Sequence, residues 1–311
     1  MKHFLICLFF LTAVLYRAEA QTSSQEKPVT GIQVGIFTSN IANKWIDLSY
    51  AGISQAQKLD IYLPDSGQGP FPVIIAIHGG AFKFGDKADD QLVPMLEGLR
   101  RGYAVASINY RMSGEAKSTQ LIQDVKAAVR WLRANAGTYK LNPNKMAAWG
   151  SSAGGHLSSL LGVSGDIPAF DDPALGNAKE SARVEAVVDW FGPVNFLTMD
   201  DEYALLGARG MQHSVAGSPE SEVIGSLITA APDKVKAFNP ATYITKDDPP
   251  FFIQHGSKDP LIPYLQSLNF AYNLYSVLGR DKVNVELLEG EGHGGSQFNA
   301  PQNLDKVFAF L

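Results

Sequence analysis

The chain has 311 residues, of which 45% are hydrophobic and 18% are charged, and its formal net charge is −5. This balance is typical of a globular protein and excludes a chain that is disordered throughout. The acidic net charge and the lack of a Lys/Arg block argue against a surface that binds nucleic acid or anionic membranes. We therefore expect no nucleic-acid partner and no stable membrane partner.

The first 20 residues differ in kind from the rest. Lys2 and His3 precede an apolar run over residues 4–15, and Ala18-Glu19-Ala20 follows it. A basic start, a short apolar run and an Ala-x-Ala end predict a secretory signal peptide (1–20) that is cleaved before Gln21. We therefore expect a secreted or periplasmic protein, although an uncleaved anchor remains an alternative.

The only cysteine, Cys7, lies within this segment, so the predicted mature chain has none. That excludes disulfides, a cysteine nucleophile and thiolate metal sites. No metal-binding or nucleotide-binding motif is found elsewhere, and we expect no metal or other cofactor.

Residues 21–43 are polar and form a predicted N-terminal leader, and residues 44–311 form the predicted catalytic domain. The domain opens with two alternating segments, 45–48 and 59–63, which predict half-buried strands. Continuous apolar runs follow, separated by helical patterns near 118–132 and 261–278, with Ser118 as a candidate N-cap. These buried runs, typical of parallel strands, cover residues 73–77, 103–108, 146–149, 184–188, 251–253 and 283–288.

This order predicts an α/β protein with a mostly parallel, doubly wound sheet and helices on both faces. An insert of about residues 196–246 interrupts the alternation after the run that ends near Trp190. A connection this long in a compact domain is usually functional, so we expect a lid or a binding loop there.

The segment Gly150-Ser151-Ser152-Ala153-Gly154 fits the pattern G-x-S-x-G between a predicted strand and a predicted helix. In that context the turn is so tight that small residues must flank the serine, whose Oγ is then exposed above the sheet. Ser152 is therefore the predicted nucleophile. The alternative is a glycine-rich turn around a structural serine.

The segment 77–82, Ile-His-Gly-Gly-Ala-Phe, closes another predicted strand and resembles the HGGG-type oxyanion loop of lipases and esterases. By this resemblance, the backbone N–H groups of Gly80, Ala81 and Ala153 form the oxyanion hole. The third glycine of the pattern is Ala81 here, and a backbone donor survives that change provided that φ remains negative. A plain Gly-Gly turn is the alternative.

Two further residues complete a catalytic set. Asp259 follows the predicted strand 251–253, and His293 follows the final predicted strand. The order Ser152, Asp259, His293 is that of the α/β-hydrolases, and each residue comes just after a strand. Asp259 is the predicted acid that orients His293, the predicted general base. Asp259 could instead be a helix N-cap, and Asp247 and Asp248, which precede their strand, are weaker candidates for the acid.

The remaining histidines have structural roles in this interpretation: His78 supports the oxyanion loop, His156 packs behind the nucleophile and His255 supports the acid loop. A surface position is expected for His213. Three aromatic residues at strand ends are candidates for substrate binding, although ordinary core packing is as good an interpretation. They are Phe82, Trp190 and Phe191.

Several segments resemble the bacterial feruloyl-esterase-like α/β-hydrolases, which are related to the hormone-sensitive-lipase group. They are LDIYLP (59–64), HGGAFKFGD (78–86), GSSAGGHL (150–157) and DPPF (248–251). The resemblance extends from about residue 40 to the C-terminus. It implies an eight-stranded hydrolase sheet and activity on esters of small or aromatic acids, often those that decorate plant xylan.

The leading hypothesis is a secreted serine carboxylic ester hydrolase that acts through an acyl-enzyme, on feruloyl or acetyl esters of plant polysaccharide. Its substrate would be a small-molecule or oligosaccharide ester. A broad short-chain carboxylesterase is the first alternative, since one fold carries many specificities. A serine peptidase of the same fold and a non-catalytic binding protein on this scaffold are the others.

Overall fold

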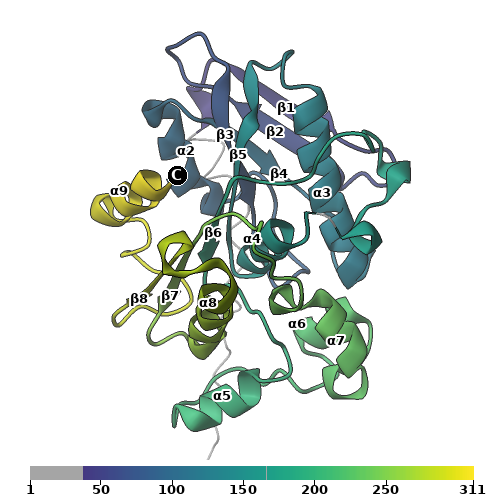
Figure 1. Ribbon diagram of the computed structural model, residues 1–311, viewed down its shortest axis with the longest axis vertical. Coiled ribbons are helices and arrows are strands. Elements are labelled where there is room, and N and C mark those ends of the chain that lie inside the picture. Colours follow the sequence, from purple (N-terminus) through teal and green to yellow (C-terminus); the bar gives the residue numbers. More distant parts are fainter. Residues whose placement is uncertain (1–37, 166) are drawn as a thin grey trace, which may run out of the picture. The chain divides into compact units, whose positions relative to one another are not determined.

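The structure, a computed structural model, describes residues 38–165 and 167–311 (Figure 1). The predicted signal peptide and most of the predicted leader lie outside these residues, and both stay predictions. No helix in the described part of the chain is long and apolar enough to cross a membrane.

The core of the fold is one eight-stranded sheet in the order β1-β2-β4-β3-β5-β6-β7-β8. The pairs β1–β2 and β2–β4 are antiparallel, and the other pairs are parallel. The prediction of a mostly parallel sheet is confirmed, and the topology is that of the α/β-hydrolase fold. The strands are β1 Lys44–Ser49, β2 Lys58–Tyr62, β3 Phe71–Ile77, β4 Ala104–Ile108, β5 Leu141–Ser151, β6 Ala186–Trp190, β7 Phe251–Gly256 and β8 Val283–Leu288.

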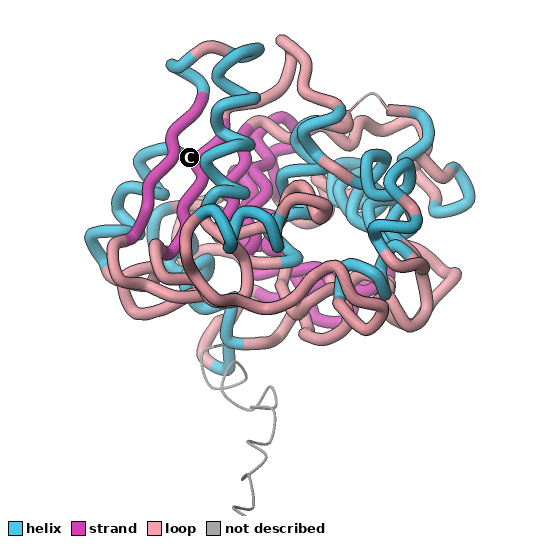
Figure 2. Tube along the Cα trace, turned by 90° about the horizontal axis from the view of Figure 1, so that it is seen from below, coloured by secondary structure: helices cyan, strands magenta, loops and turns pink. Residues whose placement is uncertain are grey.

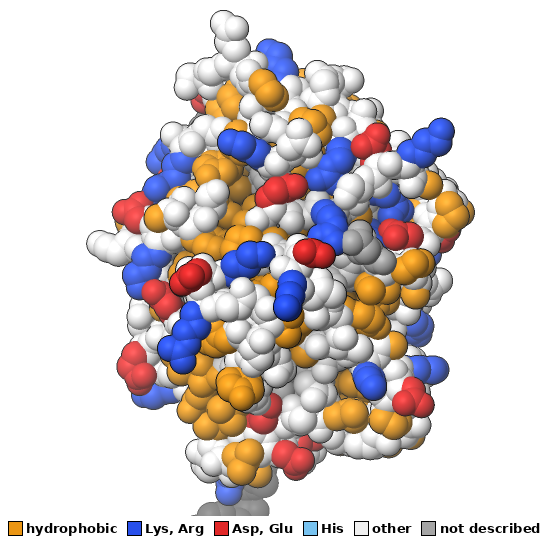
Figure 3. All heavy atoms as spheres, in the orientation of Figure 1, with side chains coloured by type: hydrophobic (Ala, Val, Ile, Leu, Met, Phe, Trp, Pro, Cys, Tyr) orange, Lys and Arg blue, Asp and Glu red, His pale blue; other side chains and the backbone are white. Residues whose placement is uncertain are grey.

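Helices cover both faces of the sheet, as predicted (Figures 1 and 2). They are α2 Val93–Leu96, α3 Ser118–Ala134, α4 Ala153–Val163, α5 Met199–Leu205, α6 Pro219–Ile224, α7 Pro232–Phe238, α8 Leu265–Leu278 and α9 Pro301–Phe310. Short 3₁₀ turns join several of them, including Asp90–Leu92 just before α2. Acidic and basic side chains are interspersed over the face in Figure 3, which therefore carries no extended field of one sign.

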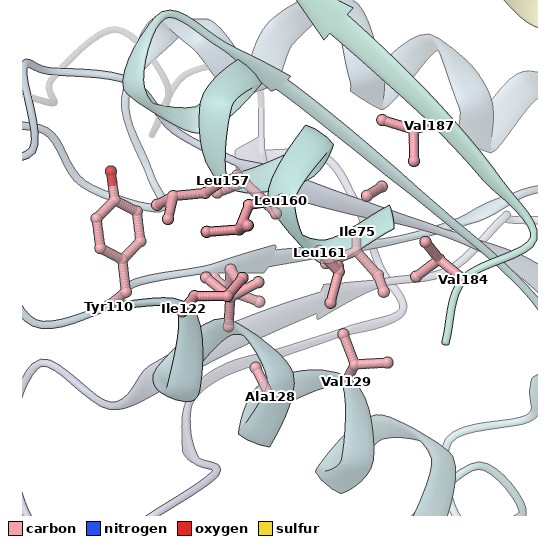
Figure 4. Packing of buried hydrophobic residues seen from close by; sticks show 14 of the residues in the cluster. Ile75, Tyr110, Ile122, Ala128, Val129, Leu157, Leu160, Leu161, Val184 and Val187 are labelled. Carbon is pink, nitrogen blue, oxygen red and sulfur yellow. The ribbon is translucent and has the colours of Figure 1, made fainter. Parts of the chain in front are cut away.

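The strand residues alternate between two hydrophobic cores. In β3, Val73, Ile75 and Ile77 belong to the larger core, whereas Ile74 and Ala76 belong to the smaller one. Side chains from α3, α4 and α8 complete the larger core, and side chains from α2 and α9 complete the smaller one. Figure 4 shows part of the larger core, where α3 and α4 pack against the sheet. Buried on both faces, the central strands are therefore continuously apolar.

The insert follows the sixth strand, as predicted, and carries α5, α6 and α7 between β6 and β7. The expected surface position of His213 within it is wrong. His213 is fully buried, and its Nδ1 lies 3.1 Å from Oε2 of the buried Glu220. The polar pair is covered because the insert does not lie open as a loop: its apolar side chains, among them Phe196, Val223 and Phe238, pack into the larger core.

Candidate active site

The predicted nucleophile stands on a sharp turn between β5 and α4. Ser152 has φ 55° and ψ −123°, a conformation that non-glycine residues rarely adopt, and its N–H donates to the Trp190 carbonyl at 2.8 Å. A Cβ on Gly150 would overlap the carbonyl of Gly154, and one on Gly154 would overlap the carbonyl of Ile77. The two glycines of the motif are therefore required by close backbone contacts, and together they fix the position of the serine.

A chain of two hydrogen bonds joins the three predicted catalytic residues. His293 Nε2 lies 2.8 Å from Ser152 Oγ, and His293 Nδ1 lies 2.8 Å from Asp259 Oδ2. An ionised carboxylate can only accept, so Nδ1 carries the proton and donates to Asp259. Nε2 is then free to accept from the Ser152 hydroxyl, which is the arrangement that a general base requires.

The Asp259 carboxylate is held by four groups. Oδ1 accepts the N–H groups of Leu261 and Ile262 at 2.8 and 3.0 Å, and Oδ2 faces His255 Nε2 at 3.2 Å as well as His293. Burial alone would raise the pKa of Asp259, but the hydrogen bonds from His255 and His293 outweigh it and hold this pKa well below its usual range. The carboxylate therefore stays ionised and able to stabilise a charged imidazole.

The competing aspartate has another partner. Asp248 accepts the backbone N–H and the hydroxyl of Thr245, at 2.7 and 2.9 Å, at the turn before β7. Of the candidates for the acid, Asp259 is therefore the one that the structure places against His293.

The loop after β3 adopts a left-handed turn beside the serine. Gly80, Ala81 and Phe82 have φ values of 112°, 56° and 58°. The condition of a negative φ at Ala81 is therefore not met, and Ala81 adopts the left-handed conformation that a glycine takes readily. The reason is that the Gly80 carbonyl accepts the N–H groups of both Lys83 and Phe84, at 2.9 and 2.8 Å, which closes the turn over Ala81 and Phe82.

The three predicted oxyanion donors lie around the serine. Gly80 and Ala81 line the same cleft as Ser152. Ala153 is the first residue of α4, so its N–H is among the helix donors that have no partner within the helix. Such N–H groups at a helix start favour negative charge.

A cleft of about 410 Å³ opens above Ser152 and His293. Its size is that of a small-molecule site. Trp190 and Phe191 line it, and the Phe191 ring lies 4.7 Å from the His293 ring. Sequence reasoning missed the other apolar lining residues, which are Phe84, Pro94, Leu261 and Phe298.

The assignment of Phe82 to the cleft is wrong. Its ring is only 1% exposed and packs against His156, Phe196 and Phe238 behind the loop. The turn at Ala81–Phe82 directs this side chain inward, and Phe84, which is 63% exposed, takes the place on the cleft wall.

The insert also differs from its expected role. None of residues 196–246 is among those that line the cleft. The insert instead contacts the loops from behind: Tyr203 Oη donates to the Asp259 carbonyl at 3.1 Å, and the Met211 N–H donates to the Pro260 carbonyl at 2.9 Å. The lid or binding loop that its length predicts is not part of this wall.

Three histidines support the loops, as predicted. His78 Nδ1 donates to the Gly79 carbonyl at 2.7 Å, and its ring stacks on Tyr110. His156 Nδ1 donates to the Pro193 carbonyl at 2.7 Å, and burial lowers its pKa to about 4. His255 Nε2 faces both the Ile262 carbonyl, at 3.0 Å, and the Asp259 carboxylate, at 3.2 Å. Within the described ranges, no group of three or more His, Cys, Asp or Glu side chains could hold a metal ion.

A hydrogen-bonded serine, histidine and carboxylate at the carboxyl ends of parallel strands, in this strand order, define a protein of the α/β-hydrolase class. The profile of the BD-FAE family matches residues 59–274, and the chain belongs to that family. The match includes Ser152 and Asp259 and ends before His293.

Curated relatives and solved structures agree with this class. Two relatives from Mycobacterium tuberculosis, named Probable carboxylic ester hydrolase LipM and Esterase LipC, are 33% and 32% identical over 244 residues. The alignments cover 78% of this chain and 54% and 58% of those proteins, so the chain spans about half the length of the curated relatives that it matches.

Two solved structures are similar to this chain with a TM-score of 0.77 each. One is the bifunctional GH43-CE of Bacteroides eggerthii, which is 33% identical and covers 86% of this chain and 37% of that chain. The other is a truncated form of a carbohydrate esterase from gut microbiota, which is 32% identical and covers 87% of this chain and 95% of that chain.

Proposed function

We propose that this protein is a serine carboxylic ester hydrolase. The observation that carries the proposal is the chain of two 2.8 Å hydrogen bonds from Ser152 through His293 to Asp259, at the floor of an open cleft. Relatives named as carboxylic ester hydrolase and esterase support it.

In this proposal the Ser152 oxygen attacks the ester carbonyl carbon while His293 Nε2 takes its proton. The oxyanion that forms is bound by the N–H groups of Gly80, Ala81 and Ala153. His293 then gives the proton to the leaving alcohol, which leaves an acyl-enzyme. A water molecule, deprotonated by His293, releases the acid and restores Ser152. Throughout, Asp259 keeps the imidazole in its reactive tautomer and stabilises its charged form.

We further propose that the substrates are feruloyl or acetyl esters of plant polysaccharide. One of the similar structures is named as a carbohydrate esterase. The cleft walls also include the aromatic residues Phe84, Trp190, Phe191 and Phe298, against which a flat acyl group could pack. The predicted signal peptide (1–20) supports secretion to the compartment where such polymers are met.

The test is a panel of esters assayed with the wild-type protein and Ser152→Ala. The panel holds p-nitrophenyl acetate, butyrate and octanoate, methyl ferulate, and acetylated and feruloylated xylan fragments. We expect preference for the sugar esters and a loss of at least about 10³-fold in Ser152→Ala. Equal rates on the simple short esters alone would establish a broad carboxylesterase instead. Hydrolysis that survives in Ser152→Ala would reject the mechanism.

A further inference from the structure

A glutamine that none of the motifs contains joins two parts of the site. Gln91 lies in the 3₁₀ turn Asp90–Leu92, and its side chain lines the cleft. Its Oε1 accepts the Gly79 N–H at 2.8 Å and the Ser151 hydroxyl at 2.5 Å. Gly79 directly precedes the oxyanion donors Gly80 and Ala81, and Ser151 directly precedes Ser152. One oxygen atom thus bridges the loop after β3 and the last residue of β5.

The orientation of the Gln91 amide follows from its partners. A backbone N–H can only donate, so the atom that faces Gly79 must be the oxygen. On the other side, Nε2 donates to Asp89 Oδ2 at 3.0 Å, and a carboxylate can only accept. Asp89 Oδ1 also accepts the Gln91 N–H at 3.0 Å. The carboxylate of Asp89 therefore holds the glutamine at two points, and the side-chain amide cannot flip without losing its bonds to Gly79 and Asp89.

The bridged loops are in direct contact at this point. A Cβ on Gly79 would lie 2.6 Å from the Ser151 carbonyl and 2.8 Å from Gln91 Oε1. Gly79 therefore lets the loop pass close to Ser151, and the hydrogen bond to Gln91 holds the loop at that spacing together with van der Waals contact. The loop itself is strained, with positive φ at Ala81 and Phe82, and a strained loop persists only where its surroundings determine it.

We infer that Gln91 is a positioning residue, which sets the distance between the oxyanion donors and Ser152. The inference rests on the proposed function. Displacement of the oxyanion donors by a fraction of an ångström weakens their stabilisation of the negative charge, which exists only in the transition state. Binding of the neutral ester changes little. Loss of the bridge should therefore lower kcat and leave KM nearly unchanged.

The test compares Gln91→Met with Gln91→Glu. Methionine has nearly the same length and volume but cannot accept the two hydrogen bonds. We expect Gln91→Met to lower kcat about 10- to 100-fold, with KM within about twofold of wild type. The carboxyl group introduced by Gln91→Glu can accept both bonds, and a proton shared with Asp89 can replace the lost Nε2–H. This variant should recover at least about a third of the lost kcat.

The matched control is Gln123→Met, the same change on α3, where the amide donates to the Ala169 carbonyl at an exposed position. It should retain the wild-type kcat. If Gln91→Met fails to fold, Gln91→Asn provides the test, since its shorter side chain cannot span the same bonds.

The possible failures are separable. An inactive wild-type protein would reject the proposed function itself. A wild-type kcat in Gln91→Met, with Ser152-dependent hydrolysis intact, would reject the role of Gln91 alone. A rise in KM with unchanged kcat would also reject it, because the residue would then bind substrate rather than position the oxyanion donors.

Discussion

The loop after β3 and the insert after β6 meet at Phe82, yet they are built differently. In the loop, Ala81 and Phe82 have positive φ although neither is glycine. In residues 196–246, only glycines have positive φ, at Gly207 and Gly225. Each strained non-glycine residue costs of order 1–3 kcal/mol, and such residues gather where function requires them.

The comparison shows how strain at the cleft is tolerated. The insert contributes Phe196 and Phe238, whose rings lie 6.0 and 5.9 Å from the ring of Phe82. It also donates hydrogen bonds to the backbone of Asp259 and Pro260. The relaxed segment thus supports the strained loop after β3 and the acid loop from behind, as a brace, and does not line the cleft. Four predictions test this division between chemistry in the loops and support from the insert.

The largest expected effect is on the chemistry and follows from Asp259→Asn. Oδ1 is fixed by two backbone N–H groups, so the new amide nitrogen would point at His293 Nδ1 and His255 Nε2. His293 would then have to accept at Nδ1 and carry its proton on Nε2, where it cannot take the proton of Ser152. We expect kcat to fall about 10³- to 10⁴-fold, measured by steady-state kinetics.

Asp248→Asn is the matched control, because this carboxylate caps the turn at Thr245, before β7 rather than after it. It should alter kcat by less than about threefold. A comparable loss in both variants would mean that the Asp259 effect is structural.

The next largest effect separates two phenylalanines that are two residues apart. Phe82 is 1% exposed within the aromatic cluster, whereas Phe84 is 63% exposed on the cleft wall. Phe82→Ala should lower the free energy of unfolding by about 3–5 kcal/mol. Phe84→Ala should change it by less than about 0.5 kcal/mol and should instead raise KM.

Both free energies are measured by urea unfolding. Equal destabilisation by the two changes would show that the inward packing of Phe82 does not hold the loop.

The third prediction concerns acid sensitivity of the same cluster. The His156 ring lies 4.4 Å from that of Phe238, and burial lowers the pKa of His156 from 6.5 to about 4. The unfolded chain therefore binds a proton more readily than the folded protein between these values. Stability should be fully present above about pH 6.5 and should fall as the pH drops towards 4, by about 3 kcal/mol.

Unfolding by urea at pH 7 and pH 4.5 measures this slope, and His156→Gln should flatten it. An unchanged slope in the variant would assign the acid sensitivity to other groups.

The sequence predicted the strands and the catalytic residues, because both depend on patterns within short segments of the chain. The run 73–77 is apolar because both faces of the sheet are covered there, and it lies in β3. The run 283–288 coincides with β8, an edge strand in which Asn284 and Leu287 are exposed. Ser152, Asp259 and His293 could be placed because each follows a strand, and the ends of parallel strands meet at one edge. The predicted start of α8, near residue 261, lies four residues before the observed start at Leu265. The reason is that Asp259 accepts the N–H groups of Leu261 and Ile262 and holds them in a turn.

Features that depend on contacts between distant segments could not be predicted from local sequence patterns. The positive φ of Ala81 depends on how the loop closes over its own carbonyl, and the inward turn of Phe82 depends on Phe196 and Phe238. Gln91 has no motif around it, and its bridge joins residues 12 and 60 positions away. Of these residues, only Phe84 could have been found from the sequence. Phe82 and Phe84 are two residues apart in one loop, and two large aromatic side chains so close together are seldom both buried.

The smallest expected effect tests the brace where it meets the acid loop. The Tyr203 hydroxyl is buried and donates to the Asp259 carbonyl at 3.1 Å. Tyr203→Phe keeps the ring and leaves that carbonyl without its partner. We expect a loss of about 1 kcal/mol in the free energy of unfolding. The fall in kcat should be about two- to fivefold, because the Met211 N–H still holds Pro260.

Tyr243→Phe is the matched control, since its hydroxyl also donates to a backbone carbonyl, that of Ala237, at an exposed position of the insert. It should leave kcat unchanged, because its partner Ala237 lies in α7 and not in the acid loop. If Tyr203→Phe lowers stability without changing kcat, the insert supports the fold at this point but not the geometry of Asp259. If both variants lower kcat equally, support is spread over the insert rather than passing through Tyr203.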